Sequence, residues 1–213
     1  MKDLYKQLRF YYTPAIGAIL IGLILLIILP KVDGHMAVNN THTEFQDVFF
    51  YYVTYLGDGL FVFAFIVLLL LVHLKKDVVF FLLLAISTML LVSVLVFLGK
   101  QIIFYDAFRP FKFLSEITHT SFYRVPGVHL HTNNSFPSGH TTAAFALFAL
   151  VAYSFRKSHL IQVLSVLIAI LVGYSRIYLS QHFLEDVVMG AIIGLASFTL
   201  SYWLISNVRP SKD

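Results

Sequence analysis

Apolar residues occur in six long runs along the chain, separated by shorter polar stretches. The runs cover approximately residues 12–29, 53–72, 78–98, 141–153, 160–174 and 187–205. A helix needs about 20 mostly apolar residues to cross a bilayer, so the shorter runs must include flanking residues. Because the runs are continuous and do not alternate, they argue against a transmembrane barrel. The pattern predicts an all-α, polytopic membrane protein: a six-transmembrane-helix bundle forming one domain, residues 1–213.

The composition supports this prediction. Hydrophobic residues make up 59% of the chain and charged residues only 12%, whereas about a quarter of the residues of a soluble domain are charged. The chain contains no cysteine, which excludes disulfides, thiolate catalysis and thiolate metal sites. No long basic run or nucleic-acid motif is present, so we expect no nucleic-acid partner.

The distribution of lysine and arginine predicts the orientation in the membrane, because these residues concentrate in cytoplasmic loops. Nine of them fall on one side of the six runs: Lys2, Lys6, Arg9, Lys75, Lys76, Arg156, Lys157, Arg209 and Lys212. Six fall on the other side: Lys31, Lys100, Arg109, Lys112, Arg124 and Arg176. We therefore expect a multi-pass protein of the cytoplasmic (inner) membrane with both termini cytoplasmic. The long loop 100–139 then lies on the outer side.

The stretch FPSGH, residues 136–140, places polar residues directly before the fourth apolar run. Pro137 suits a helix start and Ser138 can be its N-cap. Gly139 allows a ligand to approach the backbone, and free amides at a helix N-terminus bind phosphate. His140 would lie beside such an anion and could donate a proton to a leaving oxygen. The alternative is an ordinary capped helix with an incidental histidine.

A second polar stretch, SRIYLSQHFLED, covers residues 175–186 and links the last two runs. His182 and Asp186 are four residues apart, so they would share a helix face. A carboxylate that accepts from one ring nitrogen leaves the other nitrogen free to attack. Glu185, three residues from His182, is an alternative partner, and ordinary polar residues at a membrane edge are another reading. Arg176 can join the pair only if a turn separates it from His182.

The third stretch, KQIIFYDAFRP, begins at Lys100 and ends at Pro110. Nine helical steps would put Lys100 and Arg109 on opposite faces, so they converge only if the chain leaves the helix between them. Together they could neutralise a phosphoryl group, or they could simply anchor the chain among headgroups. Asp58 and Asp106 are possible supporting carboxylates behind such a site; otherwise they are a groove residue and a turn residue.

The three stretches together provide cations, an anion-binding helix start, two histidines and a carboxylate on one side of the membrane. They resemble the motifs of the type 2 phosphatidic acid phosphatase superfamily, the lipid phosphate phosphatases related to vanadium haloperoxidases. The second motif, PSGH, is intact at residues 137–140. The first motif is usually K-x6-R-P and here is K-x8-R-P, from Lys100 to Pro110. The third motif, S-R-x5-H-x3-D, is intact at Ser175, Arg176, His182 and Asp186.

This resemblance implies a bacterial membrane phosphatase that needs neither metal nor cofactor. It implies that His182 attacks phosphorus to form a phosphohistidine, that Asp186 orients His182, and that His140 protonates the leaving oxygen. The phosphate oxygens would be held by Lys100, Arg109, Ser138, Gly139 and Arg176. The active site would face the outer, periplasmic side. Candidate substrates are undecaprenyl diphosphate, phosphatidylglycerol phosphate, phosphatidic acid and lipid A phosphates.

Beyond the lipid phosphate and the surrounding membrane lipids, no obligate protein partner is expected. Two alternative functions remain open at this point. A lipid phosphotransferase would use the same phosphohistidine with another lipid as acceptor. A non-catalytic transporter of lipids or anions would use the cations, but it would have no need of the pair formed by His182 and Asp186.

Overall fold

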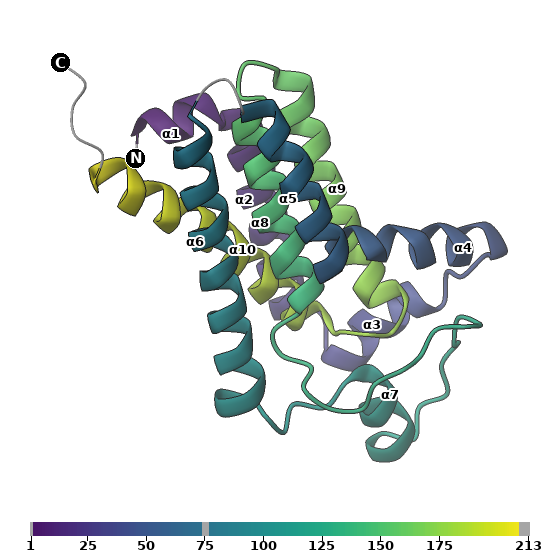
Figure 1. Ribbon diagram of the computed structural model, residues 1–213. Coiled ribbons are helices and arrows are strands. Elements are labelled where there is room, and N and C mark those ends of the chain that lie inside the picture. The colour runs from purple at the N-terminus through teal and green to yellow at the C-terminus, as the bar shows by residue number, and fades with distance from the viewer. Residues whose placement is uncertain (1, 74–76, 209–213) are drawn as a thin grey trace.

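The computed structural model describes residues 2–73 and 77–208, and these residues form helices and no strand (Figure 1). The helices are α1 (Lys2–Gln7), α2 (Arg9–Ile28), α3 (Lys31–Asn39), α4 (Glu44–Val53), α5 (Gly59–His73), α6 (Val78–Leu98), α7 (Pro110–Lys112), α8 (Gly139–Ser154), α9 (His159–Tyr178) and α10 (Leu184–Val208). The predicted all-α fold class is confirmed. Four of the cations used to predict orientation lie outside the described residues: Lys75, Lys76, Arg209 and Lys212.

Four helical segments in the described part are long and apolar enough to cross a membrane: Arg9–Ile28, Val78–Ile103, His159–Tyr178 and Leu184–Asn207. The bent pair of α4 and α5 makes a fifth if it counts as one span. Helix α8 is apolar but has only 16 residues. The predicted number of six spans therefore stays a prediction, although each of the six apolar runs contains a helix of the bundle.

The second apolar run, expected as one helix over residues 53–72, is broken. Helix α4, extended by a turn to Gly57, meets α5 at a bend of 61°. Between them Asp58 has an extended backbone, and its Oδ1 accepts a hydrogen bond from the Leu60 amide at 2.9 Å, which caps α5. As a result α4 projects sideways from the bundle instead of continuing α5 (Figure 1).

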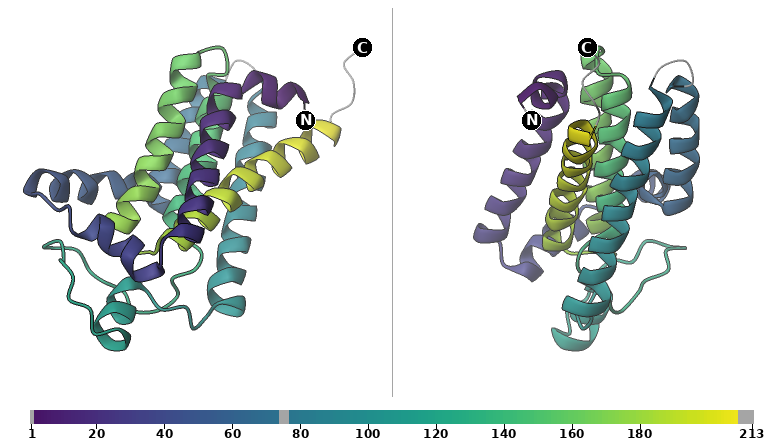
Figure 2. Two further views of the ribbon diagram at one scale, coloured as in Figure 1. Left: turned by 180° about the vertical axis from the view of Figure 1, so that it is seen from behind. Right: turned by 60° about the vertical axis from the view of Figure 1, so that its left-hand side comes forward.

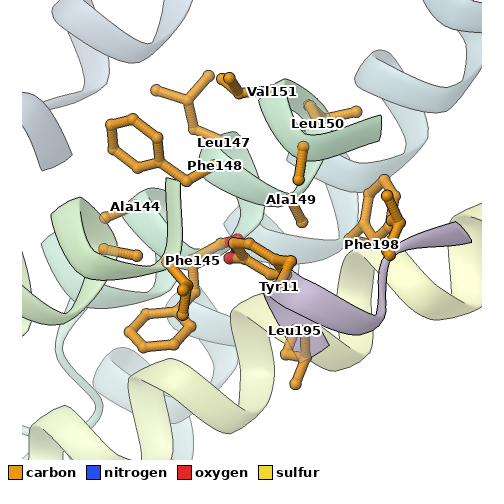
Figure 3. Packing of buried hydrophobic residues seen from close by; sticks show 14 of the residues in the cluster. Tyr11, Ala144, Phe145, Leu147, Phe148, Ala149, Leu150, Val151, Leu195 and Phe198 are labelled. Atoms are coloured by element: carbon orange, nitrogen blue, oxygen red, sulfur yellow. The ribbon is translucent and has the colours of Figure 1, made fainter. Parts of the chain in front are cut away.

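Helix α8 is the centre of the bundle and packs against α5, α6, α9 and α10. Small residues alternate with larger ones along its sequence, and eleven of its sixteen residues are buried. Figure 3 shows Phe145, Leu147 and Leu150 within this core, where the Tyr11 hydroxyl donates to the Phe145 carbonyl at 2.6 Å. Gly190 of α10 permits the close approach, because a β-carbon there would lie 2.7 Å from the Ser138 carbonyl oxygen.

The long polar connections gather at one end of the bundle, and α1 and the C-terminal end of α10 lie toward the other (Figures 1 and 2). The residue 100–139 loop lies at the first end with α3 and α4. The loop starts as a π-helical turn, Gly99–Ile103, that prolongs α6, and continues through α7 into a second π-helical turn, Phe113–Ile117. Large apolar side chains are exposed along the outer helices, as a lipid-facing surface requires. Examples are Ile21, Ile27, Phe63, Val79 and Leu90.

Candidate active site

Ser138 is the N-cap of α8, as the sequence predicts. Its hydroxyl accepts from the Thr141 amide at 3.4 Å and lies 2.9 Å from the Thr141 hydroxyl, and the residue is fully buried. Its own amide donates to the Asp186 carbonyl at 2.9 Å. The cap thus ties the start of α8 to the start of α10. The amides of Gly139 and His140 have no acceptor among the described residues, so they are available to an anion.

His182 and Asp186 are in contact, although they do not share a helix face. His182 lies in the connection before α10, which begins at Leu184. Asp186, in the first turn, reaches back: its Oδ2 is 3.2 Å from His182 Nδ1 and accepts from the Phe183 amide at 2.9 Å. The alternative partner, Glu185, instead forms an ion pair with Lys31 at 2.7 Å. The geometry therefore selects Asp186.

The imidazole of His182 is 1% exposed. Burial lowers the pKa of His182 well below its usual range, and the positive charges of Arg109, Arg176 and Lys100 lower it further. The ring is therefore neutral near neutral pH. With Nδ1 directed at the carboxylate, the proton belongs on Nδ1 and the lone pair on Nε2.

Ser135 joins this pair and was missed by the sequence interpretation. Its hydroxyl donates to Asp186 Oδ2 at 2.5 Å and lies 3.5 Å from His182 Nδ1. The side chain is buried and belongs to the loop segment directly before Pro137. A serine four residues before the start of α8 carries no spacing signal, because only the return of the long loop brings it to α10.

Lys100 and Arg109 converge, as expected if the chain leaves the helix between them. Lys100 Nζ donates to the Asn134 carbonyl at 2.5 Å, and Arg109 Nη2 is 3.5 Å from the same oxygen. Arg109 Nη1 lies 3.4 Å from His182 Nε2, the nitrogen opposite the carboxylate. Lys100 also lies beside the start of α8, since a β-carbon on Gly139 would be 4.0 Å from its Cε.

Arg176 projects from the last turn of α9, and the predicted turn between it and His182 is present. The amides of Gln181 and His182 donate to the Arg176 carbonyl at 2.9 and 3.1 Å. The guanidinium is 7% exposed and donates from Nη1 to the Thr54 hydroxyl at 2.6 Å. Its Nε has no partner in the described part of the chain. A buried, partly unsatisfied guanidinium is suited to an anion.

His140 is half-buried in the first turn of α8. It interacts electrostatically with His182 and with all three cations named above. Its carbonyl lies against the break between α4 and α5, because a β-carbon on Gly57 would be 2.6 Å from that oxygen. The structure therefore brings His140, His182, Asp186, Lys100, Arg109, Arg176 and Gly139 to one place.

The two suggested supporting carboxylates are engaged elsewhere or exposed. Asp58 caps α5 through the Leu60 amide, and no bond to a histidine or cation is found among the described residues. Asp106 is exposed, and Arg109 instead bonds backbone carbonyls and Gln181. Within residues 2–73 and 77–208, no group of three or more histidine or acidic side chains could hold a metal ion.

Residues 77–210 match the model of the PAP2 superfamily, and the chain belongs to that superfamily. It is a membrane-spanning, all-helical member. A structure of LpxE from Aquifex aeolicus is similar with a TM-score of 0.66 and 28% identity, covering 80% of this chain and 93% of that one. A PAP2-type phosphatidylglycerolphosphate phosphatase from Bacillus subtilis shares the fold, with a TM-score of 0.63, 22% identity, and coverage of 95% and 100%.

Two curated relatives match over shorter stretches. Phosphatidylglycerophosphatase B of Bacillus subtilis (strain 168) is 39% identical over 83 residues, 35% of this chain and 40% of the relative. Lipid A 1-phosphatase of Porphyromonas gingivalis is 38% identical over 72 residues, 33% of this chain and 16% of the relative. The matches thus span less than half the length of either relative.

Proposed function

We propose that the chain is a membrane-bound phosphatase that hydrolyses a lipid phosphate or diphosphate through a phosphohistidine on His182. One observation carries the proposal: the buried imidazole of His182 has its Nδ1 3.2 Å from the Asp186 carboxylate and its Nε2 3.4 Å from Arg109 Nη1. A nucleophile oriented in this way, beside a cation that can hold the phosphoryl oxygens, is arranged for phosphoryl transfer.

The reaction proceeds in two displacements. Nε2 of His182 attacks phosphorus, the bond to the lipid oxygen breaks, and His140 gives its proton to that oxygen. Asp186 stabilises the positive charge that develops on the imidazole. Neutral His140 then takes a proton from a water molecule, which attacks the phosphohistidine and releases inorganic phosphate. Both histidines return to their starting states, one water molecule is consumed for each phosphate released, and the proposed scheme uses no metal or cofactor.

The phosphoryl oxygens are held by side chains that converge from three segments. Lys100 and Arg109 reach the site from the outer loop, and Arg176 reaches it from α9. The free amides of Gly139 and His140 add the N-terminal end of α8. Ser138 acts through its cap, since its hydroxyl is already bonded to Thr141. Asp58 and Asp106 have no direct part in this scheme.

The substrate is a lipid whose phosphate lies at the membrane surface. The names of the relatives direct attention to phosphatidylglycerol phosphate and lipid A phosphates. Phosphatidic acid and undecaprenyl diphosphate present the same chemical group. The proposed active site lies at the end of the bundle opposite α1 and the C-terminal end of α10. With both termini cytoplasmic, it faces the outer side of the inner membrane, and the enzyme needs no protein partner.

The test is phosphate release from these four lipids by the full chain purified in detergent, with and without EDTA. We expect release by the wild type in both conditions, and a loss of at least about a thousandfold in His182→Ala. The control is His119→Ala, which changes an exposed loop histidine. Equal activity of His182→Ala would overturn the phosphohistidine. Phosphate appearing on an acceptor lipid instead of in solution would identify a phosphotransferase, and binding without turnover a transporter.

A further inference from the structure

Helix α3 contacts the connection between α9 and α10, which contains His182. We call residues 179–183 the nucleophile turn. Within it Ser180 is buried and has a left-handed backbone, with φ of 51°. A residue other than glycine adopts this conformation at a cost, so it persists only where surrounding contacts hold it. These contacts come from residues 31–39, which precede the part of the chain that matches the family model.

The first contact is made by His35. Its Nε2 lies 3.1 Å from the Ser180 hydroxyl, and its ring meets the Phe183 ring edge-on, with centroids 5.3 Å apart. His35 therefore touches the residues two before and one after His182. The imidazole is 3% exposed, and its Nδ1 has no partner in the described part of the chain. An apolar residue would fill this volume without a buried unpaired nitrogen. What the histidine adds is the bond to Ser180.

The second contact is made by Asn39, one helical turn further along α3. Its Nδ2 lies 3.4 Å from the Ser180 hydroxyl. The same amide also holds the outer loop: Oδ1 accepts from the Tyr123 amide at 2.7 Å, and Nδ2 donates to the Tyr123 carbonyl at 2.9 Å. The Asn39 side chain and its bond to Ser180 are buried, while the two bonds to Tyr123 are partly buried. Asn39 thus joins α3, the residue 100–139 loop and the nucleophile turn at one point.

A carboxylate extends this network on the side away from the reacting atoms. Asp47 accepts from the Tyr178 hydroxyl at 2.6 Å and from the Tyr123 hydroxyl at 2.9 Å. His42 Nδ1 lies 2.7 Å from the same carboxylate. Tyr178 is the last residue of α9, directly before the nucleophile turn. The start of the turn and its middle are therefore both held by residues of the α3–α4 segment.

We propose that His35 and Asn39 are positioning residues for the reaction: by fixing Ser180, they set the direction in which His182 presents Nε2 while Nδ1 stays on Asp186. The inference rests on the proposed function for its kinetic consequence. Neither residue contacts the side chains proposed to hold the phosphate, Lys100, Arg109 and Arg176. Both therefore act on the orientation of the nucleophile and not on substrate binding. A small misplacement of a reacting group can cost about a hundredfold in rate.

The kinetic test compares His35→Ala, Asn39→Ala and Ser180→Ala with the wild type. We expect kcat to fall by about 10- to 100-fold, with KM unchanged within about twofold. His35→Gln keeps a side-chain donor and should recover most of the rate. Because His35 and Ser180 act through one bond, the double variant should be no slower than the slower single variant. The control is Asn40→Ala, an exposed neighbour of Asn39 without a bond to the turn.

A second measurement does not depend on the substrate. Hydrogen exchange of the Gln181 and His182 amides, which donate to the Arg176 carbonyl, reports whether the nucleophile turn is held. We expect about tenfold faster exchange in His35→Ala and Ser180→Ala at an unchanged unfolding temperature. If the wild type releases no phosphate from any lipid, the proposed function fails. The exchange measurement still shows whether His35 and Ser180 hold the nucleophile turn in place.

Three outcomes would overturn the inference. The first is unchanged exchange and unchanged kcat in His35→Ala and Ser180→Ala. The second is additive losses in the double variant, which would mean that the two residues act independently. The third is a loss of kcat that follows only the unfolding temperature and is not recovered in His35→Gln. If His35→Ala does not fold, His35→Gln and Ser180→Ala carry the same comparison.

Discussion

The Ser135 hydroxyl donates a 2.5 Å hydrogen bond to Oδ2 of Asp186. The same oxygen lies 3.2 Å from His182 Nδ1, so Ser135 helps fix the carboxylate that orients His182, the proposed nucleophile. We expect Ser135→Ala to lower kcat by about tenfold or more, because a hydrogen bond to a charged group contributes roughly 1.5–3 kcal/mol. KM should change little.

Initial rates of phosphate release would measure this effect. The matched control is Ser121→Ala, an exposed serine of the same loop without a bond to the site. A rate for Ser135→Ala equal to that of the control would show that the carboxylate is held without Ser135.

Arg176 and Thr54 should differ in the size of their effects. Arg176→Lys removes the planar fork that suits phosphate oxygens, and we expect kcat/KM to fall by about 100-fold or more. Thr54→Val removes only the acceptor that holds Nη1 at 2.6 Å, so a loss of about 3- to 10-fold is expected. Steady-state kinetics over a substrate series would separate the two. Equal losses would mean that the bond to Thr54, and not the charge, dominates.

Gly190 is required for the contact between α8 and α10. In Gly190→Ala the new β-carbon would lie 2.7 Å from the Ser138 carbonyl oxygen, so the helices must move apart. We expect a destabilisation of about 1–3 kcal/mol, seen as a lower unfolding temperature. The control is Gly17→Ala in α2, where a β-carbon meets nothing within 4 Å and alanine favours the helix by about 1 kcal/mol. Equal unfolding temperatures for the two variants would contradict the packing argument.

Stability should fall as the pH decreases below 6.5, and His35 should contribute to the fall. Burial, together with a smaller repulsion from His42, lowers the pKa of His35 from its ordinary value of 6.5 to about 4. Between these values the unfolded chain binds a proton that the folded chain does not, so stability rises with pH. The contribution is complete above pH 6.5 and is lost by about pH 4, up to ~3 kcal/mol.

Unfolding temperatures measured from pH 8 to pH 4 would show this dependence. His35→Gln lacks the titrating group and should give a flatter profile over the same window. Since burial also lowers the pKa of His182, both proteins should retain some decline. Identical profiles for His35→Gln and the wild type would refute the role of His35.

The most predictable parts of the fold are those where hydrophobic runs end in strong local signals. Helix α6 begins and ends at Val78 and Leu98, the limits that its apolar run predicts. Helix α8 starts directly after Ser138, where proline and serine mark a helix start. The bend in the second run could not be predicted from hydrophobicity. The chain turns at Asp58 and its flanking glycines, although the run is apolar on both sides of this point.

The segment from Lys31 to Val53 was not predicted as helices, although one local signal was present. Thr43 and Gln46 have the spacing of a capping box, and the Gln46 amide donates to the Thr43 hydroxyl at 3.3 Å. In this segment, aromatic and polar residues are mixed without a clear apolar face, so the helical periodicity was not recognised. The buried bonds of His35 and Asn39 depend on contacts more than eighty residues away in the sequence, which no local pattern contains.

Within the site, motif spacing indicated which residues meet but not how they meet. The first motif is two residues longer than usual, and part of the extra length lies in the π-helical turn at Gly99–Ile103, which holds more residues per turn than an α-helix. Lys100 and Arg109 still reach one carbonyl oxygen. The helical spacing correctly predicted that His182 contacts Asp186. The two residues do not share a helix face, however, because His182 precedes the start of α10.

Helix α8 is too short to cross a lipid bilayer of ordinary thickness. Its 16 residues extend about 24 Å, whereas the hydrocarbon core of a bilayer is about 30 Å thick. If the other end of α8 reaches the opposite membrane surface, the N-terminal end, which we propose binds the phosphate, is recessed below the plane in which lipid headgroups ordinarily lie. A lipid can reach it by moving sideways within its own leaflet, with its tails still in the bilayer, if the leaflet thins around the protein or the phosphate sinks. For the proposed reaction, local bilayer thickness thus helps decide whether a lipid phosphate can reach the site.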